Sequence, residues 1–247
     1  MYRFKKYGFQ AYLVGNKMIK TPFDEWTSRY DSWFETPSGT LIKQYESEML
    51  LKLLNPLPKE KILDVGCGTG IFTMDVMAFG PMITGIDISE PMLRKAMDKT
   101  SQSGFTGICA DMCALPFADN SFDKVLSMTA IEFVEDAKKV IDELDRVTKK
   151  GGSIVVTTLN SLSPWANRRL NAAKKGHDLF NKIFFRSPDE MRSLVPANSV
   201  VKTAIHFQKE DCLSELVNIE RQGKENHSDK GAFLAVQWNK IQGNAGT

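Results

Sequence analysis

The sequence is poor in cysteine, nearly neutral in net charge and free of long apolar runs, and each shortage excludes a class of protein. Its 247 residues include four cysteines and no CxxC pair, which argues against a disulfide-bonded secreted domain. Cys109 and Cys113 flank Asp111, but no histidine or third cysteine stands nearby, so we expect no bound metal. Reduced thiols favour a cytoplasmic protein.

Charge and hydropathy limit the kinds of partner that this protein could bind. The formal net charge of +2 is too close to neutral to indicate a nucleic-acid partner. No stretch approaches the ~18 uninterrupted apolar residues of a transmembrane helix. Residues 1–20 are basic and carry no acid, but they lack the apolar block and cleavage site of a secretory signal. Contact with a membrane surface stays open, and no pattern indicates the oligomeric state.

What is present instead is ordinary globular composition, with 42% hydrophobic and 25% charged residues. From residue 61 onward strand-like and helix-like patterns alternate, which predicts right-handed βαβ crossovers and a parallel sheet. We expect one domain over residues 1–247, made of a helical N-terminal segment (1–56), a ligand-binding core (57–159), an insertion (160–196) and closing strands with a tail (197–247). The expected strands after the first are Met82–Ile88, Phe105–Ala110, Phe122–Met128, Ser153–Thr158, Val200–Phe207 and Gly231–Trp238.

A glycine turn is the central motif of the core. Lys61–Val65 has the pattern of a short buried strand, and Gly66-Cys67-Gly68-Thr69-Gly70 follows it directly, before an apolar run that begins at Ile71. Glycines allow backbone conformations closed to other residues and let a ligand approach without an intervening side chain. A strand, a glycine turn and a helix in this order are typical of a nucleotide site, although glycine turns also serve packing.

Asp64 and the glycine spacing indicate which nucleotide binds. Asp64 precedes the first glycine by two residues, and the glycine spacing is GxGxG in place of the GxGxxG of dinucleotide sites. A carboxylate there would repel a phosphate and suits a ligand with positive charge, such as S-adenosylmethionine (SAM). Asp87 ends the next expected strand, where an acid accepts hydrogen bonds from ribose hydroxyls in either cofactor class. Asp64 and the spacing therefore oppose the alternative of a nicotinamide-dependent oxidoreductase.

Four motifs in chain order resemble those of class I SAM-dependent methyltransferases, most closely the type 11, UbiE-like group. They are Asp64–Gly70, Gly85-Ile-Asp-Ile-Ser89, Ala110-Asp-Met112 and Leu115–Asp123. The resemblance is strong over residues 40–160. It implies a Rossmann-like, doubly wound, seven-stranded and mainly parallel sheet with an antiparallel last strand and helices on both faces.

The resemblance also implies the cofactor site. In the family, the acid after the third strand accepts from the adenine amino group and an apolar neighbour stacks on the ring, which corresponds to Asp111 and Met112. Asp111 could instead serve only as a turn residue. The expected SAM-binding residues are Asp64, Gly66, Cys67, Gly68, Thr69, Gly70, Asp87, Ile88, Asp111, Met112, Met128 and Tyr30.

The segments before and after the core frame this site. An aromatic stripe that includes Phe23, Tyr30 and Trp33 recurs at helical spacing, and it fits either a core face or a cap over the cofactor cleft, as in related enzymes. Residues 160–196 mix apolar and basic side chains, which favours a lid over an acceptor pocket, although a solvated insertion would share this composition.

The expected reaction is SN2 transfer of the SAM methyl group to a small-molecule nucleophile, with a lipophilic or anionic acceptor indicated by the lid. Alignment and desolvation suffice when the acceptor is unprotonated, and a general base is needed otherwise. Relatives often carry a histidine after the fourth strand, where this sequence has Glu132 and Phe133. The candidate bases are Glu132, Tyr30 and His177. A non-catalytic partner protein with this fold is the remaining alternative.

Overall fold

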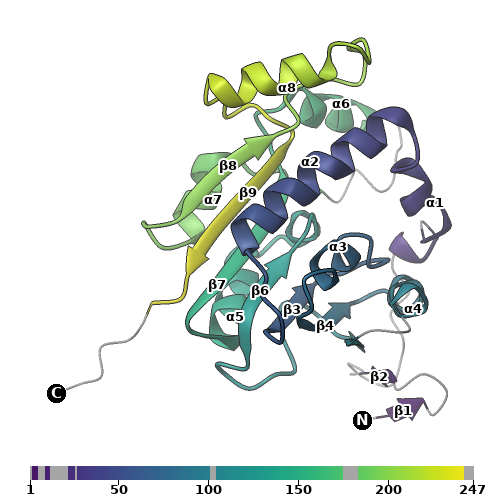
Figure 1. The fold of residues 1–247 in the computed structure, drawn as a ribbon, viewed down its shortest axis with the longest axis vertical. Coiled ribbons are helices and arrows are strands. Elements are labelled where there is room, and N and C mark those ends of the chain that lie inside the picture. Colours follow the sequence, from purple (N-terminus) through teal and green to yellow (C-terminus); the bar gives the residue numbers. More distant parts are fainter. Residues whose placement is uncertain are drawn as a thin grey trace.

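The computed structural model describes residues 2–4, 9–11, 22–25, 27–100, 104–174 and 183–241, and a sheet organises them (Figure 1). The nine strands of this sheet lie in the order β1-β2-β5-β4-β3-β6-β7-β9-β8. They are β1 (Tyr2–Phe4), β2 (Phe9–Ala11), β3 (Lys61–Val65), β4 (Met82–Asp87), β5 (Phe105–Cys109), β6 (Phe122–Ser127), β7 (Thr148–Leu159), β8 (Val200–Ala204) and β9 (Phe233–Asn239).

The seven strands expected from the sequence form the main part of this sheet. Strands β5, β4, β3, β6 and β7 pair in parallel, and β9 inserts antiparallel between β7 and β8. The mainly parallel sheet with an antiparallel last strand is therefore confirmed. All five parallel strands end at the same edge, which is where open α/β sheets bind their ligands.

The prediction that residues 1–56 are helical throughout was wrong at their beginning. β1 and β2 form an antiparallel pair, and β2 runs parallel to β5, with Gln10 opposite Ile108. Without them β5 would be an edge strand whose unpaired N–H and C=O groups invite another strand. Helical structure starts later, with a 3-10 turn (Pro22–Glu25), α1 (Thr27–Trp33) and α2 (Pro37–Leu54).

Helix α2 begins at Pro37, and Thr36 caps its N-terminus. The Thr36 hydroxyl accepts a hydrogen bond from the Gly39 amide at 3.1 Å, and Pro37 occupies the first turn, where it loses no helical hydrogen bond. The helix ends at Asn55, which has a left-handed φ of 46°.

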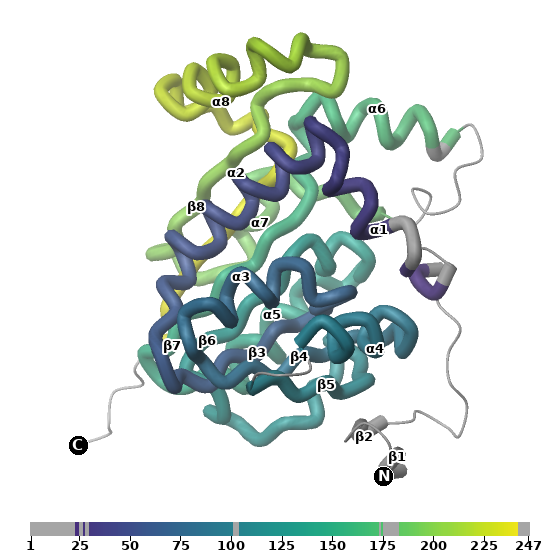
Figure 2. The backbone as a smooth tube through the Cα atoms, turned by 45° about the vertical axis from the view of Figure 1, so that its right-hand side comes forward, coloured from purple at the N-terminus to yellow at the C-terminus, as the bar shows by residue number. Residues whose placement is uncertain are grey.

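Helices cover both faces of the sheet, as expected. The apolar faces of α2, α3 (Thr73–Met77) and α4 (Glu90–Lys99) pack on one face. α5 (Ala137–Val147) and α7 (Pro188–Leu194) pack on the other, around Val140, Leu144 and Met191. Figures 1 and 2 both place α6 (Pro164–Ala173) and α8 (Leu216–Glu225) together at the end of the molecule away from β4 and β5.

Several element ends differ from the sequence predictions. α5 ends at Val147 and β7 begins at Thr148, so Gly151, with φ +76°, lies inside a strand that was expected to start at Ser153. β8 stops at Ala204, before the left-handed Ile205, and α8 was not anticipated. No helix in the described ranges is long and apolar enough to cross a membrane.

Candidate active site

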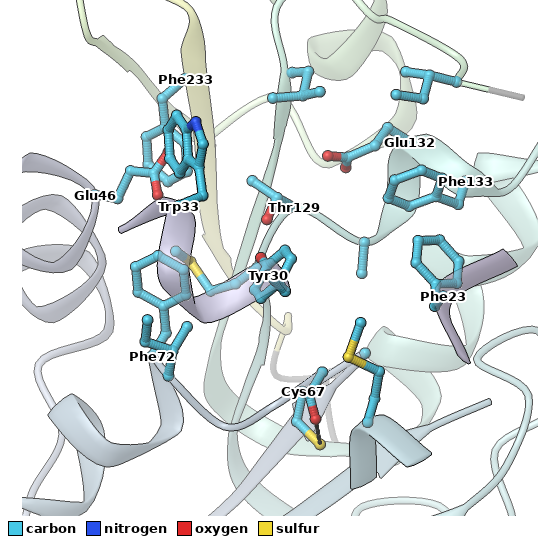
Figure 3. Close-up of a pocket in the computed structure, with 18 of the residues that line it drawn as sticks. Phe23, Tyr30, Trp33, Glu46, Cys67, Phe72, Thr129, Glu132, Phe133 and Phe233 are labelled. Carbon is cyan, nitrogen blue, oxygen red and sulfur yellow. Dashed lines mark hydrogen bonds between the residues drawn. The ribbon is translucent and has the colours of Figure 1, made fainter. Parts of the chain in front are cut away.

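A cavity of about 1160 Å³ opens at the carboxyl edge of the parallel strands (Figure 3). It gathers most of the expected site residues from segments far apart in sequence. Thr69 and Gly70 are not in its wall, and His177 lies outside the described residues. The expected residues that line it are Tyr30, Asp64, Gly66, Cys67, Gly68, Asp87, Ile88, Asp111, Met112, Met128 and Glu132.

Asp64 presents an unsatisfied carboxylate oxygen to this region. The side chain is 2% exposed, and its Oδ2 accepts a hydrogen bond from the Thr73 hydroxyl at 2.6 Å. Its Oδ1 is buried without a partner. Burial raises the pKa of Asp64 to about 7, with Thr73 lowering it and the nearby Asp87 charge adding to the rise. A ligand cation at Oδ1 would supply the missing interaction.

The glycine loop leaves its inner surface bare. The amides of Gly66 and Cys67 both donate to the Ile86 carbonyl, at 2.8 and 2.9 Å, which ties the loop to the end of β4. Gly68 has φ +53°, and a Cβ built on it would meet nothing within 4 Å. At Gly66 a Cβ would lie 2.4 Å from that of Ala130. Gly66 therefore serves packing, whereas Gly68 leaves open space at the cavity wall.

Asp87 joins the loop to the next helix. Its Oδ2 accepts from the Gly68 amide and its Oδ1 from the Ser89 amide, both at 2.8 Å. Burial raises the pKa of Asp87 to about 6, although these backbone bonds lower it. Asp87 thus orders the start of α4 and also lines the cavity.

A hydrogen bond from Thr69 connects the N-terminal segment to the glycine loop. The Thr69 hydroxyl donates to Asp31 Oδ1 at 2.5 Å, and Asp31 Oδ2 pairs with Lys95 at 2.9 Å and with Lys99 at 2.7 Å. Burial alone would raise the pKa of Asp31, but the hydrogen bonds from these partners leave it below its usual value. No local pattern predicts this contact, because Asp31 and Thr69 are far apart along the chain. It holds α1 against the glycine loop and α4.

Tyr30 and Thr129 stand where β6 ends. Figure 3 shows the Tyr30 hydroxyl turned toward Thr129. Burial raises the pKa of Tyr30, and the hydrogen bond with Thr129 opposes this rise. Thr129 has φ +44°, a left-handed conformation that is rare for a β-branched residue, and its amide donates to the Thr157 hydroxyl at 2.9 Å. Such strain clusters at functional sites, and sequence reasoning did not single out Thr129.

Glu132 lies on a short 3-10 turn (Ile131–Phe133) after β6 and is 1% exposed. Figure 3 shows its carboxylate turned toward the space above Thr129, and its Oε2 has no hydrogen-bond partner. Burial raises the pKa of Glu132 to about 7, while a backbone hydrogen bond, the Arg169 charge, the Thr158 hydroxyl and the Arg186 charge oppose the rise.

Hydrogen bonds from Arg186 hold the turn that carries Glu132 in place, and the sequence analysis did not predict this role. The Phe184 amide also donates to the Glu132 carbonyl at 2.7 Å. The guanidinium of Arg186 donates to four carbonyl oxygens, those of Ile131, Phe184, Val134 and Glu135, at 3.0, 3.2, 2.6 and 3.3 Å.

Helix α6 supplies part of the cavity wall from the predicted insertion. The Trp165 indole donates to the Phe207 carbonyl at 2.7 Å, which fixes α6 beside β8 and its following loop. The Arg169 guanidinium lies over the Trp165 ring, 5.6 Å from its centroid. Glu46, 8% exposed on α2, lines the same region, and burial raises its pKa to about 8 against the opposing charge of Arg169.

Comparison with known proteins shows which domain family the core of this chain matches. Residues 63–156, from β3 into β7, match the family model of the type 11 methyltransferase domain. A SAM-dependent methyltransferase of Thermotoga maritima has the same fold, with a TM-score of 0.65 and 23% identity, over 88% of this chain and 97% of that one.

Two curated relatives extend the comparison. The malonyl-[acyl-carrier protein] O-methyltransferase of Erwinia pyrifoliae is 39% identical over 112 residues, 45% of this chain and 42% of that protein. An uncharacterized protein of Methanocaldococcus jannaschii is 29% identical over 222 residues, 89% of this chain and 98% of that protein. This chain spans about half the length of the malonyl-[acyl-carrier protein] O-methyltransferases that it matches.

The motifs, the sheet and the family match over residues 63–156 identify a class I SAM-dependent methyltransferase domain in this chain. The cofactor of this class is S-adenosylmethionine, and the described residues fit it. The unpartnered Asp64 Oδ1 suits its ammonium group, and the open space beside Gly68 admits a ligand against bare backbone.

Proposed function

We propose that this protein transfers the methyl group of SAM to a small-molecule nucleophile with an apolar body. One observation carries the proposal: a single cavity holds the glycine loop and Asp64 together with an aromatic region around Tyr30 and Glu132. Phe23 and Phe133 form an edge-to-face pair in this region, with ring centroids 4.6 Å apart. A cavity of about 1160 Å³ has room for cofactor and acceptor together.

The cofactor roles proposed for the lining residues follow their chemistry. Asp64 would pair with the ammonium group and Asp87 with the ribose hydroxyls, since both are carboxylates at strand ends in the cavity wall. Asp111 and Met112 would hold the adenine. Thr69 and Gly70 would support the loop without lining the cavity. Thr69 binds Asp31, and a Cβ on Gly70 would lie 3.1 Å from Ala96.

The catalytic contribution of the chain would be alignment, water exclusion and proton removal. Bound SAM supplies an activated methyl group on a sulfonium. The aromatic wall excludes water from the acceptor, and the buried Glu132 carboxylate would accept the proton of a protic acceptor. A carboxyl whose pKa is about 7 is well matched to a general base at neutral pH.

The segments on either side of the core would close the cavity. Support for a lid in residues 160–196 comes from Trp165, Arg169 and Ile183, which line the cavity from this segment. Support for an N-terminal cap comes from Tyr30 and Trp33 in the same wall and from the bond between Asp31 and Thr69.

The test is SAM-dependent release of S-adenosylhomocysteine in an acceptor screen that includes aromatic alcohols, amines, acids and malonyl thioesters. We expect turnover with at least one class and retained SAM binding without acceptor. Binding of SAM without turnover of any class would instead favour a non-catalytic partner protein.

A further inference from the structure

Two buried polar atoms in the acceptor part of the cavity have no partner among the described residues. One is Oε2 of Glu132 and the other is Nη1 of Arg169. Both side chains line the cavity, one from the turn after β6 and the other from α6. A buried donor or acceptor without a partner costs free energy, and more so when the group is charged. A bound acceptor would satisfy both atoms if it donated a hydrogen bond to Glu132 Oε2 and accepted one from Arg169 Nη1.

Arg169 lacks a permanent counterion. Its charge interacts with Glu132 and Glu46, yet its Nη1 has no hydrogen-bond partner within the described part of the chain. Burial raises the pKa of Glu46 to about 8, so this acid is largely neutral at pH 7. Glu132, with a pKa of about 7, is ionised only in part. The guanidinium, whose own pKa is lowered by burial, would gain from an anion in the cavity.

The geometry of Arg169 suits a planar or tetrahedral anion. The guanidinium rests on the Trp165 ring, and Trp165 is fixed by its bond to the Phe207 carbonyl, so the cation is held in place before any ligand binds. Arg168 and Lys209 add positive charge to the cavity lining. Arg168 pairs with Glu210 at the surface. Arg169 and Lys209 would attract the anionic group of an acceptor.

Because it rests on the proposed function, the inference concerns the acceptor of that same site. We propose that the acceptor is a small acid with an apolar body, whose carboxylate or phosphate binds Arg169 and whose nucleophilic hydroxyl or amine donates to Glu132.

The step balances without a further reactant. The lone pair of the acceptor oxygen or nitrogen forms a bond to the methyl carbon as the sulfur–carbon bond breaks. The electrons of that bond stay on sulfur, which leaves S-adenosylhomocysteine. The acceptor proton passes to Glu132 and then to water. The groups that face Glu132 in this step are Arg169 from α6, Arg186 from the chain before α7, Glu46 from α2 and Tyr30 from α1.

The binding arm of the test uses protein saturated with S-adenosylhomocysteine. Calorimetry would compare 4-hydroxybenzoate with phenol, 4-aminobenzoate with aniline, and 4-hydroxyphenyl phosphate with phenol, so that each acid is matched to its neutral body. Three variants would be measured: Arg169→Met, Arg169→Lys and, as control, Arg192→Met. Arg192 is exposed on α7 and pairs with Asp189. Melting temperatures would accompany every measurement.

We expect the acids to bind at least tenfold more tightly than the neutral bodies, with the better anion identifying carboxylate or phosphate. Arg169→Met should remove this preference by about tenfold to a hundredfold, the usual worth of a bond to a charged group. Arg169→Lys should keep part of it, and Arg192→Met all of it. Equal binding of acids and neutral bodies, no binding of any acid, or equal behaviour of Arg169→Met and Arg192→Met would overturn the proposal.

The turnover arm separates this proposal from the proposed function. Glu132→Gln should lower kcat for the bound acids and remove the rise in rate as pH increases through about 7, while KM and SAM affinity stay within about threefold. SAM-dependent methylation of neutral acceptors only, insensitive to Arg169→Met, would refute the acid class and leave methyl transfer standing. Failure of the wild-type protein to bind SAM would refute the proposed function itself.

Discussion

At the scale of single residues, the site is dominated by carboxylates that the fold buries at strand ends. Asp64, Asp87 and Glu132 each lie at the carboxyl edge of the sheet, and burial raises the pKa of each. Burial removes the hydration of these carboxylates, and the donors of the protein replace it only in part. Each should therefore reveal its role through affinity or rate more than through stability.

Asp87→Ala should weaken SAM and S-adenosylhomocysteine alike, by about tenfold to a few hundredfold, because both ligands carry the same ribose. The structure adds a second effect: the Gly68 and Ser89 amides lose their acceptor, so the melting temperature should also fall. Calorimetry and thermal unfolding measure the two effects. A less stable protein with unchanged affinities would show that Asp87 only orders the start of α4.

Asp64 predicts the pH dependence of cofactor binding. In its proposed role the ionised carboxylate would bind the ammonium group, and the pKa of Asp64 in the ligand-free protein is about 7. Affinity for S-adenosylhomocysteine should therefore fall as pH drops below about 7, approaching tenfold per pH unit in the window above the Asp87 pKa of about 6. Asp64→Asn should bind weakly at every pH with no such slope. If the affinity of the wild type does not change between pH 7.5 and pH 6, the assignment of Asp64 is contradicted.

At the scale of elements, contacts between distant segments decide how the site is presented. The turn after β6 is held by Arg186, whose segment lies beyond α6, and α1 is held by Asp31 against Thr69 and α4. Neither contact lies in a local motif. Both contacts involve segments that lie outside the strand, glycine loop and helix of the cofactor motif.

Arg186→Met should lower kcat by tenfold or more and leave SAM affinity within about threefold. The substitution frees the turn that carries Glu132, and it leaves carbonyl groups without their donor, so the melting temperature should drop by several degrees. Arg192→Met, at an exposed position on α7, is the matched control. An unchanged kcat would show that the position of Glu132 does not matter for the rate.

The same division explains what the sequence could and could not predict. The glycine loop, Asp64 and Asp87 are local signals with a strand before and a helix after, and their positions in the cavity wall were foreseen. Thr129, Arg169 beside Glu132, and the Arg186 hydrogen bonds depend on packing between segments that no short pattern connects. β1 and β2 escaped notice for a similar reason, since their strand structure depends on the edge that β5 offers.

At the scale of the whole molecule, buried acids couple the stability of the fold to pH. The pKa of Glu46 is raised from 4.5 to about 8, and those of Asp64 and Glu132 to about 7. A carboxyl with a raised pKa in the folded state binds protons more tightly there than in the unfolded chain. Its contribution to stability is therefore most favourable below its ordinary pKa and is lost as pH rises to the folded value.

Glu46→Gln isolates this effect, because glutamine resembles the protonated acid at every pH. The variant and the wild type should be similarly stable near pH 4.5, and the variant should be increasingly more stable up to about pH 8, by on the order of a few kcal/mol. Denaturant unfolding at a series of pH values measures the difference. A difference that stays flat with pH would show that Glu46 is ionised in the fold.

The most direct test of the central claim is calorimetric titration of SAM into the wild type and two glycine variants. Gly68→Val and Gly80→Val both place a β-branched residue at a left-handed position, with φ of +53° and +79°, so they carry similar backbone strain. Of these two glycines, only Gly68 lines the cavity. We expect the wild type and Gly80→Val to bind SAM and Gly68→Val to lose at least about a hundredfold in affinity, nearly 3 kcal/mol, while remaining folded. Failure of the wild type to bind SAM, or equal binding by the two variants, would contradict the account.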